Sequence, residues 1–419
     1  MLLCDAGYYG TLAAVRSLGR AGVPIVTVDR SVLSPARFSR YSSLHLACPP
    51  FEQTQKWVEW LLRLGQSGPR QAIYATSDAV SFALASYRDE LRSSFDLYQP
   101  DLGTMMRILD KWQLLEHARG VGIDTPETWL PGSRRDAEQI ANEVGGTILV
   151  KPRSQLSVQS NTKGVVAGPG AKAVLAGYDH LIEQGVYDSE FANQYPDVML
   201  PLLQRYHPEA LEAIYSLSGF RDISGQHVAM LGACKVLQRP RRLGVGLCFE
   251  EAAVDPDIAE GAARLCERIG YYGVFEIEFI HSGGRTLLID FNARFYNQMV
   301  FDIARGLDLP GLAYAGAIGD DREVARLAST MPSQKKSQGL AFCNRFGLEV
   351  TIGAQRVFGT MSREEAMRWR EWLNAPGRRV LDAVRDAGDP LPAAIDVAQQ
   401  LLQYVRHPRA FVRLLAMAR

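Results

Sequence analysis

The order of apolar and polar positions near the N-terminus predicts a strand, a turn, a helix and a second strand. Leu2 and Leu3 come before a short turn, and apolar residues then recur at helical spacing over residues 11–21. Gly22 stands where a helix commonly ends, and an apolar run follows over residues 23–28. This succession is typical of the βαβ start of a parallel sheet.

Similar patterns extend this Rossmann-like first domain to about residue 103 and predict mixed elements after it. Together they indicate the α/β (α+β) fold class. Helices are expected over residues 53–64, 80–91, 105–119, 133–144 and 258–269, and strands over 72–75, 147–151, 198–206, 211–216, 227–237, 272–280 and 286–291. Beyond about residue 322 short strands alternate with helices, and residues 406–419 form a candidate basic amphipathic helix.

Composition narrows the class of protein. Lys plus Arg and Asp plus Glu each number 46 in 419 residues, so the net charge is zero and a general electrostatic grip on nucleic acid is not expected. The six cysteines form no CxxC pair, which favours reduced thiols over disulfides or zinc. No apolar run reaches the roughly 18–20 residues of a membrane span, and Asp5 interrupts any signal-peptide core. We therefore expect a cytoplasmic protein.

The strongest candidate site lies on two strands joined by Gly283 and Gly284. Residues two apart face the same side of a strand, so Asp290 and Asn292 share a face, and Arg294 can follow them. A hairpin turning at the two glycines places Glu278 across from Asp290. Three side-chain oxygens then converge from two strands.

Oxygen donors of this kind are the ligands that Mg²⁺ prefers. Arg294 beside them suits a transferring phosphoryl group or an oxyanion. Glu276 shares the face of Glu278, so it is either a supporting residue or the competing ligand. The alternative is a hairpin whose polar face is merely solvated. Asp290 and Asn292 are poor strand formers inside an apolar run, which favours the site.

These residues, in their order, resemble the ATP-grasp superfamily, and more narrowly its carboxylate–amine ligases of the D-aspartate ligase-like group. The resemblance covers residues 1–320. It implies a Rossmann-like domain over 1–103, an ATP-grasp domain over 104–320 with a lid subdomain at about 112–200, and a C-terminal extension over 321–419. Its motifs are Asp110-Lys111, Lys151-Pro152, Gln204-Arg205-Tyr206, Glu278 and Asp290-Phe291-Asn292-Ala293-Arg294, with Asp5 to Gly10, Arg37 to Tyr41 and Thr76-Ser77-Asp78 in the first domain.

The resemblance also implies the roles of single residues around ATP. The loop 154–164 would cover the phosphates. The implied contacts are Lys111 and Lys151 at the phosphates with Lys163 beside them, Gln204, Arg205 and Tyr206 at the adenine, Glu212 at the ribose, and Lys235 at the γ-phosphate or acyl phosphate.

Three departures from the family pattern stand out. Asp290 replaces the usual Glu, the loop 154–164 lacks the usual glycines, and Arg205 stands where an acidic residue is common. A basic cluster, Arg239, Arg241 and Arg242, is a candidate clamp for a carboxylate.

What the resemblance implies is an ATP-dependent ligase. It would join a small-molecule carboxylate to an amine through an acylphosphate, with ATP and Mg²⁺ (Mn²⁺ as an alternative ion), and an amino acid or small peptide as substrate. A homodimer is compatible with it. The alternatives are an ATP-binding sensor or pseudoenzyme on the same fold, and a dinucleotide oxidoreductase. The last is disfavoured because residues 7–10 lack a complete GxGxxG.

Overall fold

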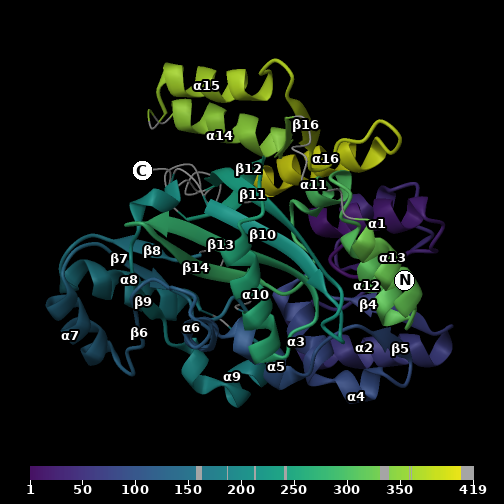
Figure 1. Ribbon diagram of the computed structural model, residues 1–419, viewed down its shortest axis with the longest axis horizontal. Coiled ribbons are helices and arrows are strands. Elements are labelled where there is room, and N and C mark those ends of the chain that lie inside the picture. The colour runs from purple at the N-terminus through teal and green to yellow at the C-terminus, as the bar shows by residue number, and fades with distance from the viewer. Residues whose placement is uncertain are drawn as a thin grey trace.

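Three β-sheets surrounded by helices make up the molecule (Figure 1). The computed structural model describes residues 1–156, 163–185, 187–211, 214–239, 243–330, 339–357, 359 and 361–406. Within those ranges no helix has the length and apolar character needed to cross a membrane. The mixed helix and strand content agrees with the α/β expectation.

The first sheet is parallel and has the strand order β3-β2-β1-β4-β5. The order reverses at β1, because β2 pairs on one side and β4 on the other. A crevice therefore opens at the carboxyl ends of β1 and β4. The elements are β1 (Leu2–Leu3), α1 (Tyr9–Arg20), β2 (Val26–Asp29), η1 (Pro35–Phe38), β3 (Leu44–Ala47), α2 (Thr54–Ser67), β4 (Gln71–Tyr74), α3 (Asp78–Ser86), α4 (Arg88–Leu91) and β5 (Phe95–Leu97).

A small antiparallel sheet of order β6-β9-β7-β8 follows, and its buried face packs on α7 and α8. Two helices lead into it from the first sheet. The elements are α5 (Leu102–Leu109), α6 (Lys111–Arg119), β6 (Thr128–Trp129), α7 (Arg134–Val144), β7 (Ile148–Lys151), β8 (Val165–Ala167), α8 (Ala171–Gln184), α9 (Ser189–Gln194), η2 (Pro196–Met199), β9 (Leu202–Arg205) and η3 (Pro208–Leu211).

The largest sheet has seven strands in the order β14-β13-β10-β11-β12-β15-β16. All its pairs are antiparallel except β15 with β16. Figure 1 places this sheet at the centre, with α10 across one face. The elements are β10 (Ile214–Arg221), β11 (Val228–Arg239), β12 (Val245–Ala252), α10 (Pro256–Ile269), β13 (Gly273–Ser282), β14 (Arg285–Asn292), β15 (Leu340–Cys343) and β16 (Arg379–Asp382).

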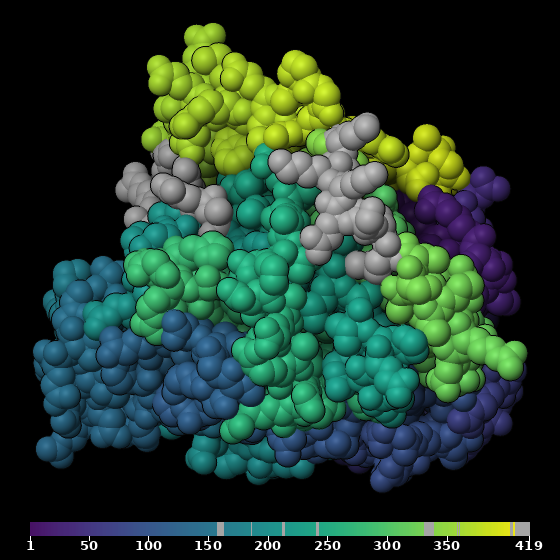
Figure 2. Space-filling model, in the orientation of Figure 1, coloured from purple at the N-terminus to yellow at the C-terminus, as the bar shows by residue number. Residues whose placement is uncertain are grey.

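The remaining helices complete the C-terminal part. Figure 2 shows α14 and α15 gathered at one end of the molecule, in yellow-green. The helix α16 packs against η1 of the first domain. The bounds are α11 (Met299–Ala304), α12 (Leu309–Ala317), α13 (Asp321–Ser329), α14 (Arg345–Val357), α15 (Arg363–Leu373) and α16 (Leu391–Arg406).

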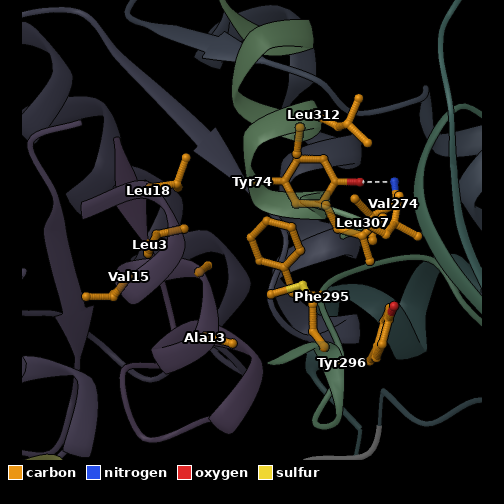
Figure 3. Packing of buried hydrophobic residues seen from close by; sticks show 14 of the residues in the cluster. Leu3, Ala13, Val15, Leu18, Tyr74, Val274, Phe295, Tyr296, Leu307 and Leu312 are labelled. Carbon is orange, nitrogen blue, oxygen red and sulfur yellow. Dashed lines mark hydrogen bonds between the residues drawn. The ribbon is translucent and has the colours of Figure 1, made fainter. Parts of the chain in front are cut away.

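A buried aromatic junction ties the first sheet to the end of β14 (Figure 3). The rings of Tyr74 and Phe295 lie 4.7 Å apart between centroids. The Val274 amide donates to the Tyr74 hydroxyl at 2.6 Å, and the Phe295 amide donates to the Ala75 carbonyl at 3.1 Å. These contacts hold the residues after β14 against the carboxyl end of β4.

Two of the expected elements were wrong in detail. The single helix expected over 105–119 is two helices, because Asp110 ends α5 and its side chain caps α6. The strand expected over 198–206 begins instead as the 3-10 helix η2. Residues 407–419, which hold most of the expected C-terminal helix, lie outside the described residues. The boundaries at residues 103 and 320 stay predictions.

Candidate functional site

The hairpin of β13 and β14 brings four polar side chains to one face. Glu278 pairs directly with Asp290, as the alternation predicted, and Glu276 pairs with Asn292. The two acidic residues Glu278 and Asp290 are each only 7% exposed. Burying two carboxylates this deeply is costly unless cations or hydrogen bonds compensate.

Two lysines supply that compensation. Lys235 on β11 donates from Nζ to Oε1 of Glu278 at 2.5 Å, and Lys111 at the start of α6 donates from Nζ to Asp290. Burial raises the pKa of Glu278, but Lys235 and Lys163 outweigh it and hold this pKa below its usual value. Burial also raises the pKa of Asp290, yet Lys111 and Lys151 hold it far below its usual range. Both carboxylates are therefore ionised.

Two further lysines lie near these pairs. Lys151 ends β7 and donates from Nζ to the carbonyl of Ile289 at 2.9 Å. Burial, and then repulsion from Lys111, lowers the pKa of Lys151 to about 7. For Lys163 burial lowers the pKa, but attraction to Glu278 and Asp290 raises it overall. The four lysines expected near the phosphates thus gather around the two carboxylates.

An ion pair that the sequence analysis missed fixes two of these lysines. Arg153 donates to both carboxylate oxygens of the fully buried Asp110, at 2.8 and 2.7 Å. The Lys111 amide donates to the Arg153 carbonyl at 2.9 Å. The start of α6 is thereby fastened to the segment just after β7, where Lys151 lies. The available signal was an arginine two residues after a strand-ending lysine.

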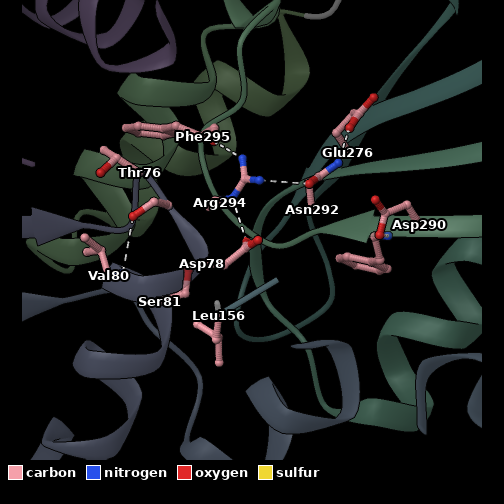
Figure 4. A network of polar contacts seen from close by, with 12 residues as sticks. Thr76, Asp78, Val80, Ser81, Leu156, Glu276, Asp290, Asn292, Arg294 and Phe295 are labelled. Atoms are coloured by element: carbon pink, nitrogen blue, oxygen red, sulfur yellow. Dashed lines mark hydrogen bonds and ion pairs between the residues drawn. The ribbon is translucent and has the colours of Figure 1, made fainter. Parts of the chain in front are cut away.

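Arg294 links the hairpin to the first domain (Figure 4). Its Nε donates to Oδ1 of Asp78 at 2.7 Å, and its two terminal nitrogens donate to the Tyr8 hydroxyl and to Oδ1 of Asn292, each at 3.0 Å. Burial lowers the pKa of Arg294, but Asp78 and Tyr8 outweigh it and raise this pKa. A permanently charged guanidinium thus stands where β14 meets the first domain. Sequence reasoning placed Arg294 here but assigned nothing to Tyr8.

Glu276 has a different environment from Glu278. It accepts from Nδ2 of Asn292 at 2.6 Å, from Nε2 of Gln298 at 3.0 Å and from Oγ of Ser216 at 2.5 Å, all neutral donors. Burial, and then repulsion from Glu278, raises the pKa of Glu276 to about 7. These contacts are those of a residue that orients Asn292, which favours Glu278 over Glu276 as a metal ligand.

The first cleft opens above this charged floor and has an empty volume of about 650 Å³. That size lies within the range of about 300–1,000 Å³ common for ligand pockets. One end is charged and the other is mostly apolar. The lining residues are Pro126, Leu149, Lys151, Gln155, Lys163, Gln204, Arg205, Tyr206, His207, Ala210, Ile214, Lys235, Gln238, Leu243, Gly244, Glu278, Ile280, Ile289 and Asp290.

The residues expected at the adenine line the apolar end, although the side chains of two of them point to other partners. Gln204 donates from Nε2 to Oγ1 of Thr128 at 2.9 Å. Arg205 pairs with Glu127 at 2.9 Å and lies over the Trp129 ring at 5.6 Å. Three further candidates, Glu212, Arg241 and Arg242, lie outside the described residues, and Arg239 donates to the Gly347 carbonyl at 3.5 Å.

A second cleft, with an empty volume of about 1020 Å³, adjoins the first and shares Gln155 and Lys163 with it. It lies at the carboxyl ends of β1 and β4. The sequence analysis quoted several of its residues as motifs but predicted no cleft from them. The lining residues are Asp5, Tyr8, Phe51, Glu52, Thr76, Ser77, Asp78, Ala79, Pro152, Ser154, Gln155, Leu156, Lys163, Val245 and Arg294.

The donors on the hairpin fit a hard divalent cation. Glu278, Asp290 and Asn292 offer oxygen, and both carboxylates are ionised. Across the described ranges no three His, Cys, Asp or Glu side chains form a metal-binding group. An ion held here would therefore need the amide oxygen and oxygens from a ligand or water.

Comparison with known proteins identifies the fold. No family model and no curated protein matches the chain. Among solved structures, the biotin carboxylase domain of Hydrogenobacter thermophilus 2-oxoglutarate carboxylase matches with a TM-score of 0.60 and 16% identity, over 76% of this chain and 69% of that chain. N5-carboxyaminoimidazole synthetase from Staphylococcus aureus matches with a TM-score of 0.55 and 16% identity, over 75% and 77%. The ribonucleotide synthetase of the same kind from Thermus thermophilus matches with 0.55 and 17%, over 76% and 78%.

These likenesses show that the chain has the ATP-grasp fold, so the expected fold class is confirmed. At such low identity they say nothing of substrates. The narrower resemblance to the D-aspartate ligase-like group stays a prediction.

Proposed function

We propose that the protein is an ATP-dependent ligase that joins a carboxylate to an amine through an acylphosphate and releases ADP and phosphate. The observation that supports this most is the pairing of Glu278 with Lys235 and of Asp290 with Lys111 at one end of a cleft whose other end is apolar. A nucleoside triphosphate has the same polarity, with a charged tail and a flat base.

The four lysines would receive the triphosphate tail. A phosphate oxygen can replace a carboxylate as the partner of Lys111 or Lys235, which leaves Glu278 and Asp290 for a divalent ion. Mg²⁺ would be held by Glu278, Asp290 and Asn292, and when bound it offsets negative charge on the phosphates. The structure of the Hydrogenobacter thermophilus domain is a complex with MgADP, ADP and bicarbonate, which supports this use of the fold.

The apolar end would receive the base. Leu149, Ile214, Ile280 and Ile289 provide surface for a flat ring, and Gln204 and Tyr206 border it. We propose that the side chain of Arg205 does not read the base, because Glu127 and Trp129 hold it.

The proposed chemistry has two steps. A carboxylate oxygen of the substrate attacks the γ-phosphorus, the bond to the bridging oxygen breaks, and ADP leaves with that electron pair. The amine nitrogen then attacks the acyl carbon, the carbon–oxygen bond breaks, and phosphate leaves as the nitrogen gives up a proton. Lys111, Lys151 and Lys235 would orient the phosphates, and Arg294 would donate to the oxyanion.

Hydroxylamine tests this function without knowledge of the amine, because it converts any acylphosphate to a hydroxamate. The protein would be incubated with ATP, Mg²⁺, hydroxylamine and a panel of amino acids, peptides and other small carboxylates. We expect one class of carboxylate to give hydroxamate and equal ADP. Binding of ATP with no ADP release for any carboxylate would support the sensor or pseudoenzyme instead. Binding of NAD(P)H without ATP would favour the oxidoreductase.

A further inference from the structure

The second cleft lies where the first sheet offers a ligand site. Asp5 follows β1 and Thr76 follows β4, on the two sides of the point where the strand order reverses. Lys163 lines both clefts, and Arg294 lines the second. A ligand in the second cleft would therefore reach the phosphate end of the first.

The charges of the second cleft are unevenly matched. Arg294 is paired with Asp78, and the charge of Lys163 is drawn to Glu278 and Asp290 on the other side. Asp78 also stands in the first turn of α3, where a negative charge meets the positive helix end. The cations lining the cleft thus already have acidic partners.

Asp5 and Glu52, by contrast, form no ion pair within the part of the chain that the structure describes. The side chain of Asp5 has neutral hydroxyl partners, Ser77 and Thr76, and Oγ1 of Thr76 donates to Oδ2 at 3.2 Å. Burial, and to a smaller extent repulsion from Asp29 and Glu52, raises the pKa of Asp5 to about 6. Asp29 itself accepts from the amides of residues 7 and 31, both at 2.9 Å. Asp5 and Glu52 therefore form an acidic end of the cleft that lacks a positive charge.

The backbone at Asp5 supports a role for this end. Asp5 has a φ of +51°, and no other residue except glycine has a positive φ among the described ones. Such a conformation costs free energy, and it is kept here at a carboxylate without a cation.

We propose that the second cleft binds the amine substrate and that Asp5 and Glu52 hold a positive group of that substrate remote from the reacting nitrogen. This rests on the proposed function, since the reacting nitrogen must meet an acylphosphate made at the first cleft. That nitrogen must be neutral to attack, so the group held as a cation is a second one. The acceptor is a diamine, a polyamine or another amine with a distant positive charge. A carboxylate at the distant position would face Asp5 and Glu52 and be repelled.

A matched series of four-carbon amines tests this specificity. Putrescine, butylamine and γ-aminobutyrate differ only in the distant group, which is positive, neutral or negative. With ATP, Mg²⁺ and the carboxylate found by the hydroxamate screen, we expect KM for putrescine to be about tenfold below that for butylamine, a difference typical of one charge-assisted contact. γ-Aminobutyrate is expected to be the poorest acceptor.

Two variants locate the effect. Glu52→Gln and Asp5→Asn should bring putrescine within about threefold of butylamine while leaving butylamine unchanged, because only the charge contact is lost. Asn tolerates a positive φ, so Asp5→Asn keeps the backbone. Glu59→Gln, at an exposed glutamate of α2 that lines neither cleft, is the matched control and should retain the full preference.

Equilibrium binding of putrescine to the full chain separates this proposal from the proposed function. Putrescine binding that Glu52→Gln weakens, without any hydroxamate, would overturn the ligase and keep the amine site. Hydroxamate formation with putrescine no better than butylamine or γ-aminobutyrate would overturn the amine site and keep the ligase. Loss of both results would overturn both.

Discussion

The two clefts meet at Gln155 and Lys163, yet their carboxylates have opposite surroundings. In the first cleft Glu278 and Asp290 each contact a lysine, and both are deeply buried. In the second cleft Asp5 and Glu52 have no ion-pair partner among the described residues. Matched charges must be exchanged when a ligand arrives, whereas unmatched charges await one. The first cleft thus has the character of a site for an anion with its metal, and the second that of a site for a cation.

Asp290→Asn tests the first cleft most directly. The amide cannot balance the charges of Lys111 and Lys151 or bind a divalent ion as strongly, so we expect kcat for hydroxamate formation to fall about 10³-fold. Circular dichroism would check that the fold persists. Asp321→Asn, on the exposed start of α13, is the control and should have no effect. A kcat within tenfold of the unchanged protein would contradict the role of Asp290.

Arg294→Lys tests the link between the clefts. Lysine keeps the charge but cannot donate at once to Asp78, Tyr8 and Asn292. We expect a loss of about 10²-fold in kcat, with a smaller change in KM for ATP, measured by ADP release. Arg264→Lys on α10, where the arginine pairs with Glu260 at the surface, should change neither constant. An effect confined to KM would show that Arg294 binds ATP and does not act in the chemical step.

Asp5→Asn tests whether the second cleft keeps an uncompensated charge. The folded pKa of about 6 lies above the unfolded value of about 3.9. The folded state therefore holds the extra proton between these values, and the stabilisation present below about pH 4 is lost as the pH rises to about 6. Above that pH the variant should be the more stable by roughly 1–2 kcal/mol, and at about pH 4 the difference should vanish. Urea unfolding at several pH values measures this, and a variant less stable at about pH 8 would refute it.

Arg205→Ala tests the apolar end of the first cleft. Because the guanidinium contacts Glu127 and Trp129, we expect KM for ATP to change by less than about threefold and stability by less than about 1 kcal/mol. Steady-state kinetics and thermal unfolding would show it. A tenfold rise in KM would mean that the Arg205 side chain reads the base after all.

Local patterns in the sequence anticipated the hairpin because its register is a local property. Alternation along two strands and a Gly283-Gly284 turn suffice to pair Glu278 with Asp290. The break at Asp110 was not anticipated, because no Gly or Pro marks it. The buried contact of Asp110 with Arg153 joins residues 43 positions apart.

The partners of the site residues depend on the packing of the whole chain. Lys111 contacts a residue 179 positions away, and Arg294 contacts one 216 positions away. Side-chain periodicity carries no information about such separations. The acidic end at Asp5 and Glu52 arises in the same way, from the order of the strands in the first sheet.

Residue order alone was enough for the fold class, the hairpin pairing and the types of groups available for a metal and phosphates, because alternation and turn geometry act over a few neighbouring residues. The choice of which carboxylate is paired with which lysine, the separate environments of Glu276 and Glu278, and the second cleft came from folding. They depend on how three sheets meet, and burial and charge at a site are set by everything that surrounds it.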